Sequence, residues 1–284
     1  MTMENNNKPK RILITGATGG MGRECALLAA DRGYDLLLAD LSHDKLEELA
    51  SDCARNGASV GHQVLDITEP SHKAQLVDAL NSSPHLDGII HTVGISPQMA
   101  DWQKIFDVDL VQTVDLLEQT RPLMNEAACA VCIASSSGYM CPDDDEIEEL
   151  LAEPGAADFS ERLQLLATKK PQLENSGLAY SYAKKALSQY VARHARKWGQ
   201  EQKRLVSLSP GLIDTAQGQR EYKAAKSINT LKSHVTLGRL GEAREIATTA
   251  LFLLSRDAAY ITGCDILVDG GLIGSLTGGR KRQP

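Results

Sequence analysis

The sequence predicts a single α/β domain in which a doubly wound parallel sheet of seven strands carries helices on both faces. Three observations lead to this fold class: short apolar runs alternate with longer helix-like segments, the apolar runs are continuous, and no linker rich in proline, glycine or serine divides the chain. Continuous apolar strands are typical of a parallel sheet that is covered on both sides. Right-handed crossovers then wind such a sheet in both directions.

The expected strands are short apolar runs, taken here in chain order: 11–15, 35–39, 59–65, 87–92, 130–134, 205–208 and 265–268. The expected helices carry apolar residues at spacings of three and four, and they are 21–32, 43–56, 70–80, 102–123 and 178–190. Residues 10–275 form the predicted domain, and residues 1–9 and 276–284 are predicted to be flexible tails.

Two long segments interrupt this alternation, an insertion at 139–176 and a predicted substrate loop at 216–235. Both leave the carboxyl ends of strands, where open α/β sheets bind ligands. They are therefore candidate walls or lids of a substrate cleft. Further pocket candidates, each of which would also suit a plain core, are Ile95, Met99, Met140 and Leu212.

Composition excludes several classes of protein. A net charge of −7 over 284 residues argues against a nucleic-acid footprint, which needs clustered Lys and Arg. No apolar stretch approaches the ~20 residues that span a bilayer, and the polar start of the chain does not resemble a secretion signal. The six cysteines lack metal-ligand spacing, and Cys129 and Cys132 are expected on opposite faces of one strand. We expect a cytoplasmic protein with reduced thiols, no metal and no membrane partner.

A glycine-rich turn, Thr15–Gly22, joins the first strand to the first helix. A strand, such a turn and a helix together place backbone N–H groups against a pyrophosphate, which predicts a Rossmann-type nucleotide site. The glycines permit a tight turn, close approach of the phosphates and close helix–strand packing. A flexible turn without a ligand is the alternative interpretation. The predicted cofactor contacts are Gly16, Thr18, Gly19, Gly20, Met21 and Gly22.

Two carboxylates at strand ends extend this site. Asp40 follows Gly16 by 24 residues, close to the roughly 20 that separate a ribose-binding acid from the loop. Its charge would repel a 2′-phosphate, which favours NAD over NADP, and a helix N-terminal acid is the alternative interpretation. Asp66, with Ile67 beside it, is either an adenine contact or a simple turn former.

A second constellation suggests acid–base chemistry. Tyr180 and Lys184 are four residues apart in a helical pattern and therefore share a face. A phenol titrates near ~10, and a neighbouring ammonium favours its ionised form. The serines at 135–137 end the fifth strand on the ligand side of the sheet, where a hydroxyl can hold a substrate oxygen, although such turns are also ordinary loop chemistry.

Taken together, these motifs resemble the short-chain dehydrogenase/reductase family from about Lys10 to Gly271. The resemblance implies hydride transfer between a nicotinamide and a secondary alcohol or ketone. It implies that Tyr180 is the acid/base, that Lys184 binds the ribose and that Ser135, with Ser136 as the alternative, orients the substrate. It adds a set of contacts near the nicotinamide end, namely Gly94, Pro210, Gly211, Ile213 and Thr215.

The chain departs from the family pattern at three places. After the fourth strand the family's Asn-Asn-Ala-Gly reads His91-Thr92-Val93-Gly94, so we expect His91 to be a packed residue. The family's relay asparagine aligns with Asp109, which leaves the proton relay open. Ser135 and Tyr180 are unusually far apart because of the insertion. That insertion resembles the 3-alpha-hydroxysteroid dehydrogenase/carbonyl reductase and coniferyl-alcohol dehydrogenase group, in which it contributes to the subunit contact.

The leading hypothesis is therefore an NAD-dependent oxidoreductase acting on CH–OH groups of a small, hydrophobic, steroid-like or aromatic alcohol or ketone. We expect a homodimer or homotetramer. A nucleotide-binding regulatory or scaffold protein of the same fold with weak or no turnover is the alternative. An epimerase or dehydratase on a sugar nucleotide would need a larger C-terminal lobe than the roughly 60 residues after the sixth strand.

Overall fold

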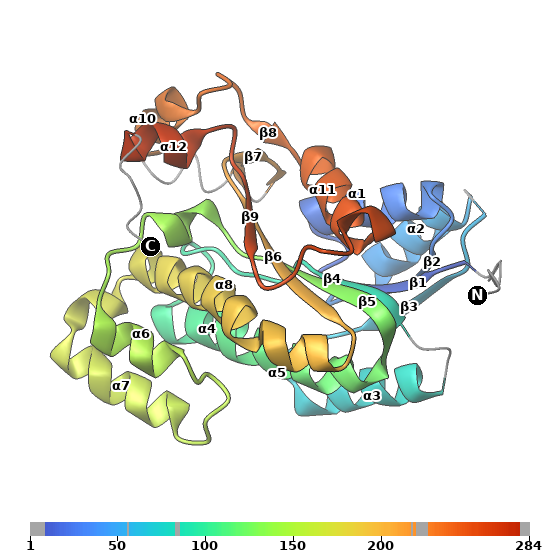
Figure 1. Cartoon of the computed structure of the whole chain (residues 1–284), viewed down its shortest axis with the longest axis horizontal. Coiled ribbons are helices and arrows are strands. Elements are labelled where there is room, and N and C mark those ends of the chain that lie inside the picture. The colour runs from blue at the N-terminus through green and yellow to red at the C-terminus, as the bar shows by residue number, and fades with distance from the viewer. Residues whose placement is uncertain (1–8, 56, 83–85, 217, 220–226, 279–284) are drawn as a thin grey trace.

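The computed structural model describes residues 9–55, 57–82, 86–216, 218–219 and 227–278. It confirms one parallel sheet of seven strands, in the order β3-β2-β1-β4-β5-β6-β9, which is doubly wound about β1 and β4 (Figure 1). The strands are β1 (Arg11–Thr15), β2 (Asp35–Asp40), β3 (Val60–Val64), β4 (Leu86–His91), β5 (Met124–Ile133), β6 (Arg204–Pro210) and β9 (Asp265–Val268).

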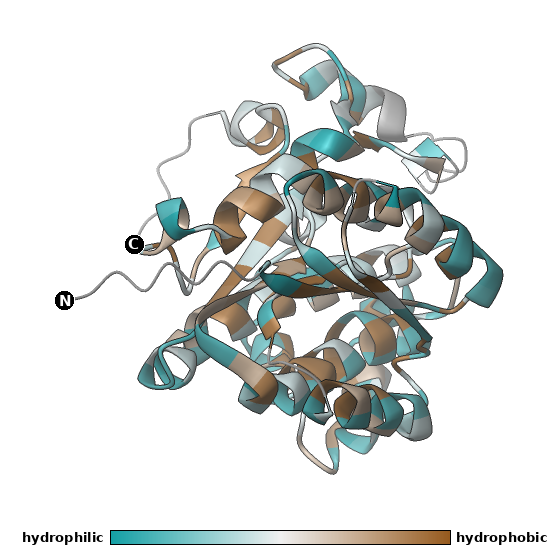
Figure 2. Ribbon diagram, turned by 90° about the vertical axis from the view of Figure 1, so that its right-hand side faces the viewer, coloured by the Kyte–Doolittle hydropathy of each residue, from teal (hydrophilic) through white to brown (hydrophobic). Residues whose placement is uncertain are grey.

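Helices cover the two faces of the sheet. One face carries α1 (Gly20–Asp31), α2 (His43–Ala54) and α11 (Ala243–Leu254). The opposite face carries α3 (Pro70–Asn81), α4 (Trp102–Phe106), α5 (Thr113–Thr120) and α8 (Ser176–Gln200). Figure 2 shows the hydrophobic residues gathered on the central strands and on the helix faces that meet them.

The strands β2, β1, β4, β5 and β6 contribute to both cores because successive side chains point to opposite faces. Ile12 and Ile14 join the core beneath α1 and α11, whereas Leu13 between them joins the core beneath α5 and α8. Cys129 and Cys132 divide in the same way, as the sequence predicts. All six cysteines are free thiols.

The predicted long helix 102–123 is interrupted. Between α4 and α5 the chain forms a π-helical turn, η1 (Asp107–Gln112), and after α5 a 3-10 turn, η2 (Arg121–Leu123). The hydroxyl of Thr113 donates a hydrogen bond to the carbonyl of Val108 at 2.9 Å, which supports the wide turn. A π-turn inserts an extra residue into the helix and re-aims the side chains around it, often at a functional site.

The insertion forms mainly helices, α6 (Asp145–Leu151) and α7 (Phe159–Lys169), between two 3-10 turns, η3 (Ser136–Tyr139) and η4 (Pro171–Glu174). Their apolar faces join the core shared by α4 and α8, and Figure 1 shows them beside those helices. The prediction that the insertion walls the cleft is therefore largely wrong: burial of its apolar face draws it to the flank, and only its first residues reach the cleft.

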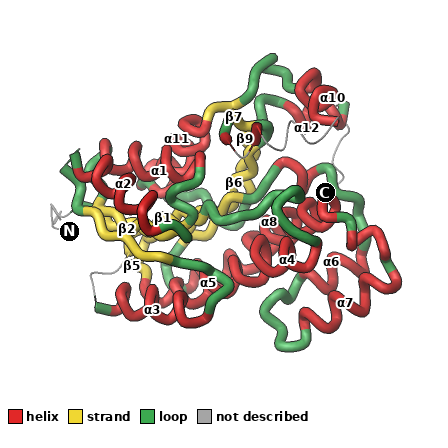
Figure 3. Tube along the Cα trace, turned by 180° about the vertical axis from the view of Figure 1, so that it is seen from behind, coloured by secondary structure: helices red, strands yellow, loops and turns green. Residues whose placement is uncertain are grey.

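The C-terminal part of the chain lies over the carboxyl edge of the sheet. A two-stranded pair, β7 (Ile213–Asp214) and β8 (Gly241–Glu242), follows the turn after β6. The helices α10 (Ser227–His234) and α12 (Leu272–Thr277) lie side by side (Figures 1 and 3). The 3-10 turn η5 (Arg256–Ala258) connects α11 to β9, and α12 follows β9. Helix α12 includes the first two positions of the predicted tail, and residues 279–284 lie outside the described residues, as do 1–8.

Among the described residues, no helix combines the length and apolar character needed to cross a membrane.

Candidate active site

A cavity of about 370 Å3 opens at the carboxyl edge of the sheet. It brings together most of the predicted site residues, which come from segments far apart in sequence. Its predicted lining residues are Gly20, Met21, Gly94, Ser135, Ser136, Met140, Tyr180, Lys184, Pro210, Gly211, Leu212, Ile213 and Thr215. Of the described residues that line it, Lys184 is the only cation and none is acidic.

The glycine-rich turn closes one end of this cavity. Gly16 has φ +69°, a left-handed conformation that suits glycine. A Cβ at Gly22 would lie 2.1 Å from the carbonyl oxygen of Gly16, so only glycine lets α1 approach the turn this closely. Helix α1 begins after Gly19 with no side-chain cap and no acid in its first turn. Its first N–H groups cannot be satisfied within the helix and are suited to an anion such as a pyrophosphate.

Asp40 lies at the end of β2 next to this turn. Its Oδ2 accepts a hydrogen bond from the N–H of Thr18 at 2.8 Å, and its Oδ1 accepts one from the N–H of Leu41 at 2.7 Å. The carboxylate therefore anchors the glycine-rich turn. Each oxygen keeps a lone pair for a further donor such as a ribose hydroxyl.

Asp66 follows β3 and is part of a turn. Its Oδ1 accepts hydrogen bonds from the N–H and the hydroxyl of Thr68. Burial opposes ionisation, but these hydrogen bonds outweigh it and lower the pKa of the carboxyl. Neither Asp66 nor the buried Ile67 lines the cavity. The turn-forming role is thus established, and the adenine contact stays a prediction.

Tyr180 and Lys184 lie one turn apart on α8, and both line the cavity. Helix α8 begins at the cap Asn175, whose side chain accepts a hydrogen bond from the N–H of Leu178 at 3.0 Å. The Nζ of Lys184 lies 5.6 Å from the centre of the Tyr180 ring and donates to the carbonyl oxygen of Ile133 at 3.3 Å. An ammonium at this distance favours the phenolate form of the tyrosine.

Asp109 belongs to the π-turn η1 and is fully buried behind Lys184. Its Oδ2 lies 3.6 Å from the Nζ of Lys184, and its Oδ1 accepts a hydrogen bond from the N–H of Ile95 at 2.8 Å. Burial raises the pKa of Asp109, against the attraction of Lys184. Asp109 thus lies beside Lys184 without lining the cavity.

His91 is a packed residue, as the sequence predicts. Its Nε2 lies 3.0 Å from the Thr113 hydroxyl, which already donates to Val108, so the ring nitrogen is the donor. Its Nδ1 then accepts from the Thr15 hydroxyl at 2.7 Å. Burial, with the charge of Lys184, lowers the pKa of His91 to about 3. The neutral ring therefore connects β1 to α5 through these two hydrogen bonds.

The serine turn, Ser135 to Ser137, follows β5 and lines the same cavity as Tyr180. Ser135 is half-buried, and its Oγ accepts hydrogen bonds from the N–H and the hydroxyl of Ser137, at 3.2 and 3.0 Å. Ser136 is buried. A Cβ at Gly138 would lie 2.9 Å from the backbone nitrogen of Lys185, so glycine lets this turn pack on α8. The more accessible hydroxyl of Ser135 favours it over Ser136.

Two pocket candidates are corrected by the structure. Ile95 packs against the core and contributes its N–H to Asp109, so its side chain does not line the cavity. Met99 is 60% exposed, and its sulfur accepts from the N–H of Ser96 at 3.5 Å. Of the predicted substrate loop, Gly218 and Leu231 line the cavity, whereas residues 217 and 220–226 lie outside the described residues.

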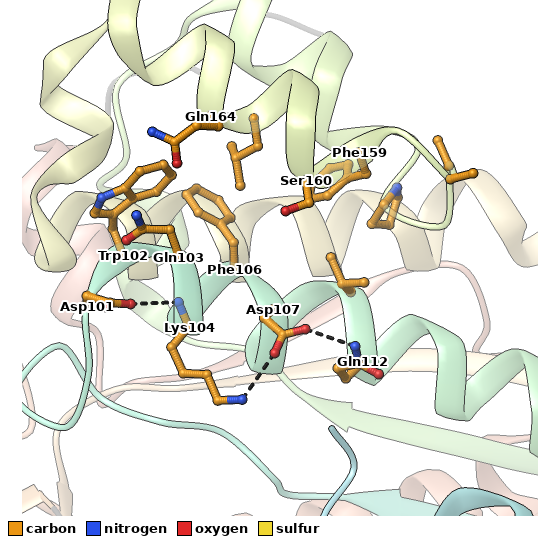
Figure 4. A pocket seen from close by; sticks show the side chains of 15 residues that line it. Asp101, Trp102, Gln103, Lys104, Phe106, Asp107, Gln112, Phe159, Ser160 and Gln164 are labelled. Atoms are coloured by element: carbon orange, nitrogen blue, oxygen red, sulfur yellow. Dashed lines mark hydrogen bonds and ion pairs between the residues drawn. The ribbon is translucent and has the colours of Figure 1, made fainter. Parts of the chain in front are cut away.

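A second cavity, of about 550 Å3, lies between α4, η1 and α7 (Figure 4). Its floor is aromatic, with Trp102, Phe106 and Phe159, and its mouth is polar. Apart from residues of the insertion, it holds none of the predicted site residues. It exists because the insertion docks beside the π-turn.

Sequence reasoning missed several lining residues: Thr92, Pro97, Gln98, Ser181 and Leu272. The hydroxyl of Thr92 donates to the carbonyl oxygens of Thr15 and Gly16, at 2.9 and 3.0 Å, and so ties β4 to the glycine-rich turn. The position of Thr92 at the end of a predicted strand could have identified it as a lining residue. No sequence feature identifies Leu272, because its position depends on how α12 folds back.

Comparison with known proteins agrees with this geometry. A family model described as short chain dehydrogenase matches residues 10–142, and one described as enoyl-(acyl carrier protein) reductase matches 166–273. The chain is 28% identical over 270 residues to the short-chain dehydrogenase/reductase bsc3 of Alternaria brassicicola, covering 94% of this chain and 96% of that one. It is 26% identical over 274 residues to the cyclopentanol dehydrogenase of Comamonas testosteroni, covering 92% and 96%.

Among solved structures, the 3-alpha-hydroxysteroid dehydrogenase from Pseudomonas sp. B-0831, complexed with NADH, superposes with a TM-score of 0.76 at 22% identity, covering 96% of this chain and all of that one. The two family models leave a gap that falls inside the insertion. Part of the insertion is thus matched by neither family model. The chain belongs to the short-chain dehydrogenase/reductase family, whose members are oxidoreductases that bind nicotinamide cofactors.

Proposed function

We propose that this protein is an NAD-dependent oxidoreductase acting on the CH–OH group of a neutral, hydrophobic secondary alcohol, or on the corresponding ketone. One observation carries the proposal: Tyr180 and Lys184 share a cavity with the open N-terminus of α1. A phosphate-binding end and an acid–base end in one cavity match the two requirements of hydride transfer with a dinucleotide.

The residues at each end fit a dinucleotide. The first turn of α1 would hold the pyrophosphate, and Asp40 would accept the adenosine ribose hydroxyls while repelling a 2′-phosphate. A Cβ at Gly20 would lie 2.8 Å from the Thr215 side chain, so the turn and the segment after β6 already meet. That segment, from Pro210 to Thr215, would hold the carboxamide. When bound, the nicotinamide supplies or accepts the hydride.

The chain's own side chains would move the proton. Tyr180, as phenolate, takes the proton of the substrate hydroxyl during oxidation and returns it during reduction. Ser135 donates to the substrate oxygen and fixes its direction. Lys184 holds the ribose hydroxyls and favours the phenolate by its charge.

The lining of the cavity supports a neutral substrate. Beyond the acid–base pair, the described surface is formed by apolar Met140, Leu212, Leu231 and Leu272 and by uncharged polar side chains. Among the described lining residues, Lys184 is the only positive charge that could pair with a carboxylate or phosphate of a substrate. The cyclopentanol dehydrogenase and hydroxysteroid dehydrogenase among the similar proteins act, by their names, on neutral ring alcohols.

A paired substrate screen tests the proposal. Purified protein is offered NAD+ or NADP+ with cyclic, benzylic and steroidal secondary alcohols, and the absorbance of the reduced nicotinamide is recorded. We expect turnover with NAD+ to exceed that with NADP+ by at least about tenfold, the discrimination that one close charge can supply. Hydroxy acids of matched ring size serve as controls and should react poorly.

Two outcomes would contradict the proposal. Dinucleotide binding without turnover of any alcohol or ketone would favour the regulatory or scaffold alternative. A preference for NADP+ would remove Asp40 from its role. The homodimeric or homotetrameric state and the cytoplasmic location remain predictions, which native mass spectrometry and cell fractionation would check; the free thiols of the described chain suit a reducing compartment.

A further inference from the structure

Behind the proposed catalytic lysine lies a carboxylate that the cavity does not reach. Asp109 is 0% exposed, and its Oδ2 lies 3.6 Å from the Nζ of Lys184, which is itself 4% exposed. This Oδ2 is one of the few buried polar atoms of the described chain without a hydrogen-bond partner. The family pattern has an amide at this position, so the extra charge requires an explanation.

Burial raises the pKa of Asp109, but the contacts of the carboxylate favour its ionised form. A proton on Oδ2 would need an acceptor, and the ammonium of Lys184 only donates. The N–H of Ile95 donates to Oδ1 at 2.8 Å, which also favours the anion. Gly94 leaves room for the pair, because a Cβ there would lie 3.0 Å from the lysine Nζ and 3.4 Å from Oδ1.

Among the described residues, no other charge compensates Lys184 from the neighbouring elements. His91 on β4 and Cys132 on β5 both interact with this lysine. Burial lowers the pKa of His91 to about 3 and raises the pKa of Cys132 to about 12, so both are neutral near pH 7. Tyr180 is the remaining titratable group near the pair. Other charged side chains of this helical segment have partners elsewhere, namely Lys104, Asp107 and Asp115.

We propose that Asp109 is the buried counter-ion of Lys184. This ion pair, which carries no net charge, sets both the pH at which Tyr180 accepts a proton and the preference of the site for oxidised over reduced nicotinamide. The inference rests on the proposed function, because it concerns the same site. Asp109 touches neither substrate nor cofactor and acts through Lys184, so it is a positioning residue.

Two consequences follow from the charge. The oxidised nicotinamide ring is a cation and the reduced ring is neutral, so an uncompensated lysine beside it would weaken NAD+ binding selectively. A negative charge near a phenol disfavours the phenolate. Removal of Asp109 should therefore let Tyr180 ionise at lower pH.

The test uses Asp109→Asn in the full-length protein. Dissociation constants of NAD+ and NADH are measured by calorimetry, without substrate. We expect the NAD+ to NADH ratio of dissociation constants to rise about tenfold, the effect of one uncompensated charge at close range. The pH profile of alcohol oxidation should shift about one unit toward acid. Asp109→Glu, which restores the charge, should return both values toward wild type.

Asp107→Asn is the matched control, because it removes the same charge from the same π-turn. The carboxylate of Asp107 accepts hydrogen bonds from Lys104 and Gln112 on the outer side of the turn (Figure 4). Its substitution should leave the NAD+ to NADH ratio of dissociation constants within about twofold of wild type. If Asp109→Asn does not fold, Asp109→Ser removes the charge with a smaller side chain and is measured in the same way.

The outcomes separate the two proposals. A wild-type protein that binds neither dinucleotide would overturn the proposed function itself. Wild-type binding and turnover, with an affinity ratio and pH profile that Asp109→Asn leaves unchanged, would overturn only the counter-ion role.

Discussion

The glycine-rich end of the cavity and its Tyr180 end are built from different parts of the chain. At the glycine-rich end the chemistry is backbone N–H groups, and the residues matter because side chains are absent, as at Gly16 and Gly22. At the other end the chemistry is side chains from α8 and the end of β5, with Asp109 of the π-turn buried behind them. One end therefore depends on steric exclusion within a short segment, and the other on packing between distant segments.

This difference predicts different responses to substitution. Damage at the glycine-rich end should affect folding and cofactor binding together, because the turn is part of the core. Damage at the Tyr180 end should affect turnover while the fold and cofactor binding persist.

The largest effect is expected for Gly22→Ala. Its Cβ would lie 2.1 Å from the Gly16 carbonyl oxygen, so either the turn or α1 must shift. We expect a loss of about 3 kcal/mol in the free energy of unfolding, as for severe overpacking, and weakened NADH binding. Urea unfolding and a fluorescence titration measure the two.

Gly199→Ala is the control for that substitution. Gly199 lies near the end of α8, and a Cβ at this position would meet nothing within 4 Å, so alanine should stabilise the helix by about 0.5–1 kcal/mol. Equal stability losses in the two variants would contradict the steric account of the turn.

Tyr180→Phe should remove the acid–base group at the Tyr180 end of the cavity. We expect kcat to fall about a thousandfold, in the range of general acid–base catalysis, with NADH affinity changed less than about threefold. Steady-state kinetics and NADH titration check this. Tyr182→Phe removes the same hydroxyl two residues along, from a side chain buried in the core, and should leave kcat nearly unchanged. Activity of Tyr180→Phe within tenfold of wild type would remove Tyr180 from its role.

The smallest effect is expected for Asp40, which anchors the glycine-rich turn and which, we propose, reads the ribose. Asp40→Asn keeps an oxygen for the Thr18 N–H but removes the charge, so the NAD-over-NADP preference should narrow by about tenfold. Asp40→Ala should narrow it similarly and also lower the melting temperature. Asp35→Asn, at the opposite end of β2, is the control. An unchanged ratio of specificity constants in Asp40→Asn would show that the charge does not read the ribose.

Local sequence determined much of this protein. The apolar runs fixed the seven strands and their buried faces, because a strand between two helix layers must be apolar on both sides. The glycine-rich turn and the Tyr180–Lys184 spacing were equally readable, since each lies within a few residues and follows from backbone sterics or helix geometry.

Only the tertiary structure decided what depends on distant segments. The π-turn that aims Asp109 at Lys184, the docking of the insertion beside α4 and α8, and the return of Leu272 to the cavity have no local signature. Each arises where two segments far apart in sequence compete for the same buried surface. A local pattern shows that a face must be buried, but the partner that buries it is chosen by the packing of the whole chain.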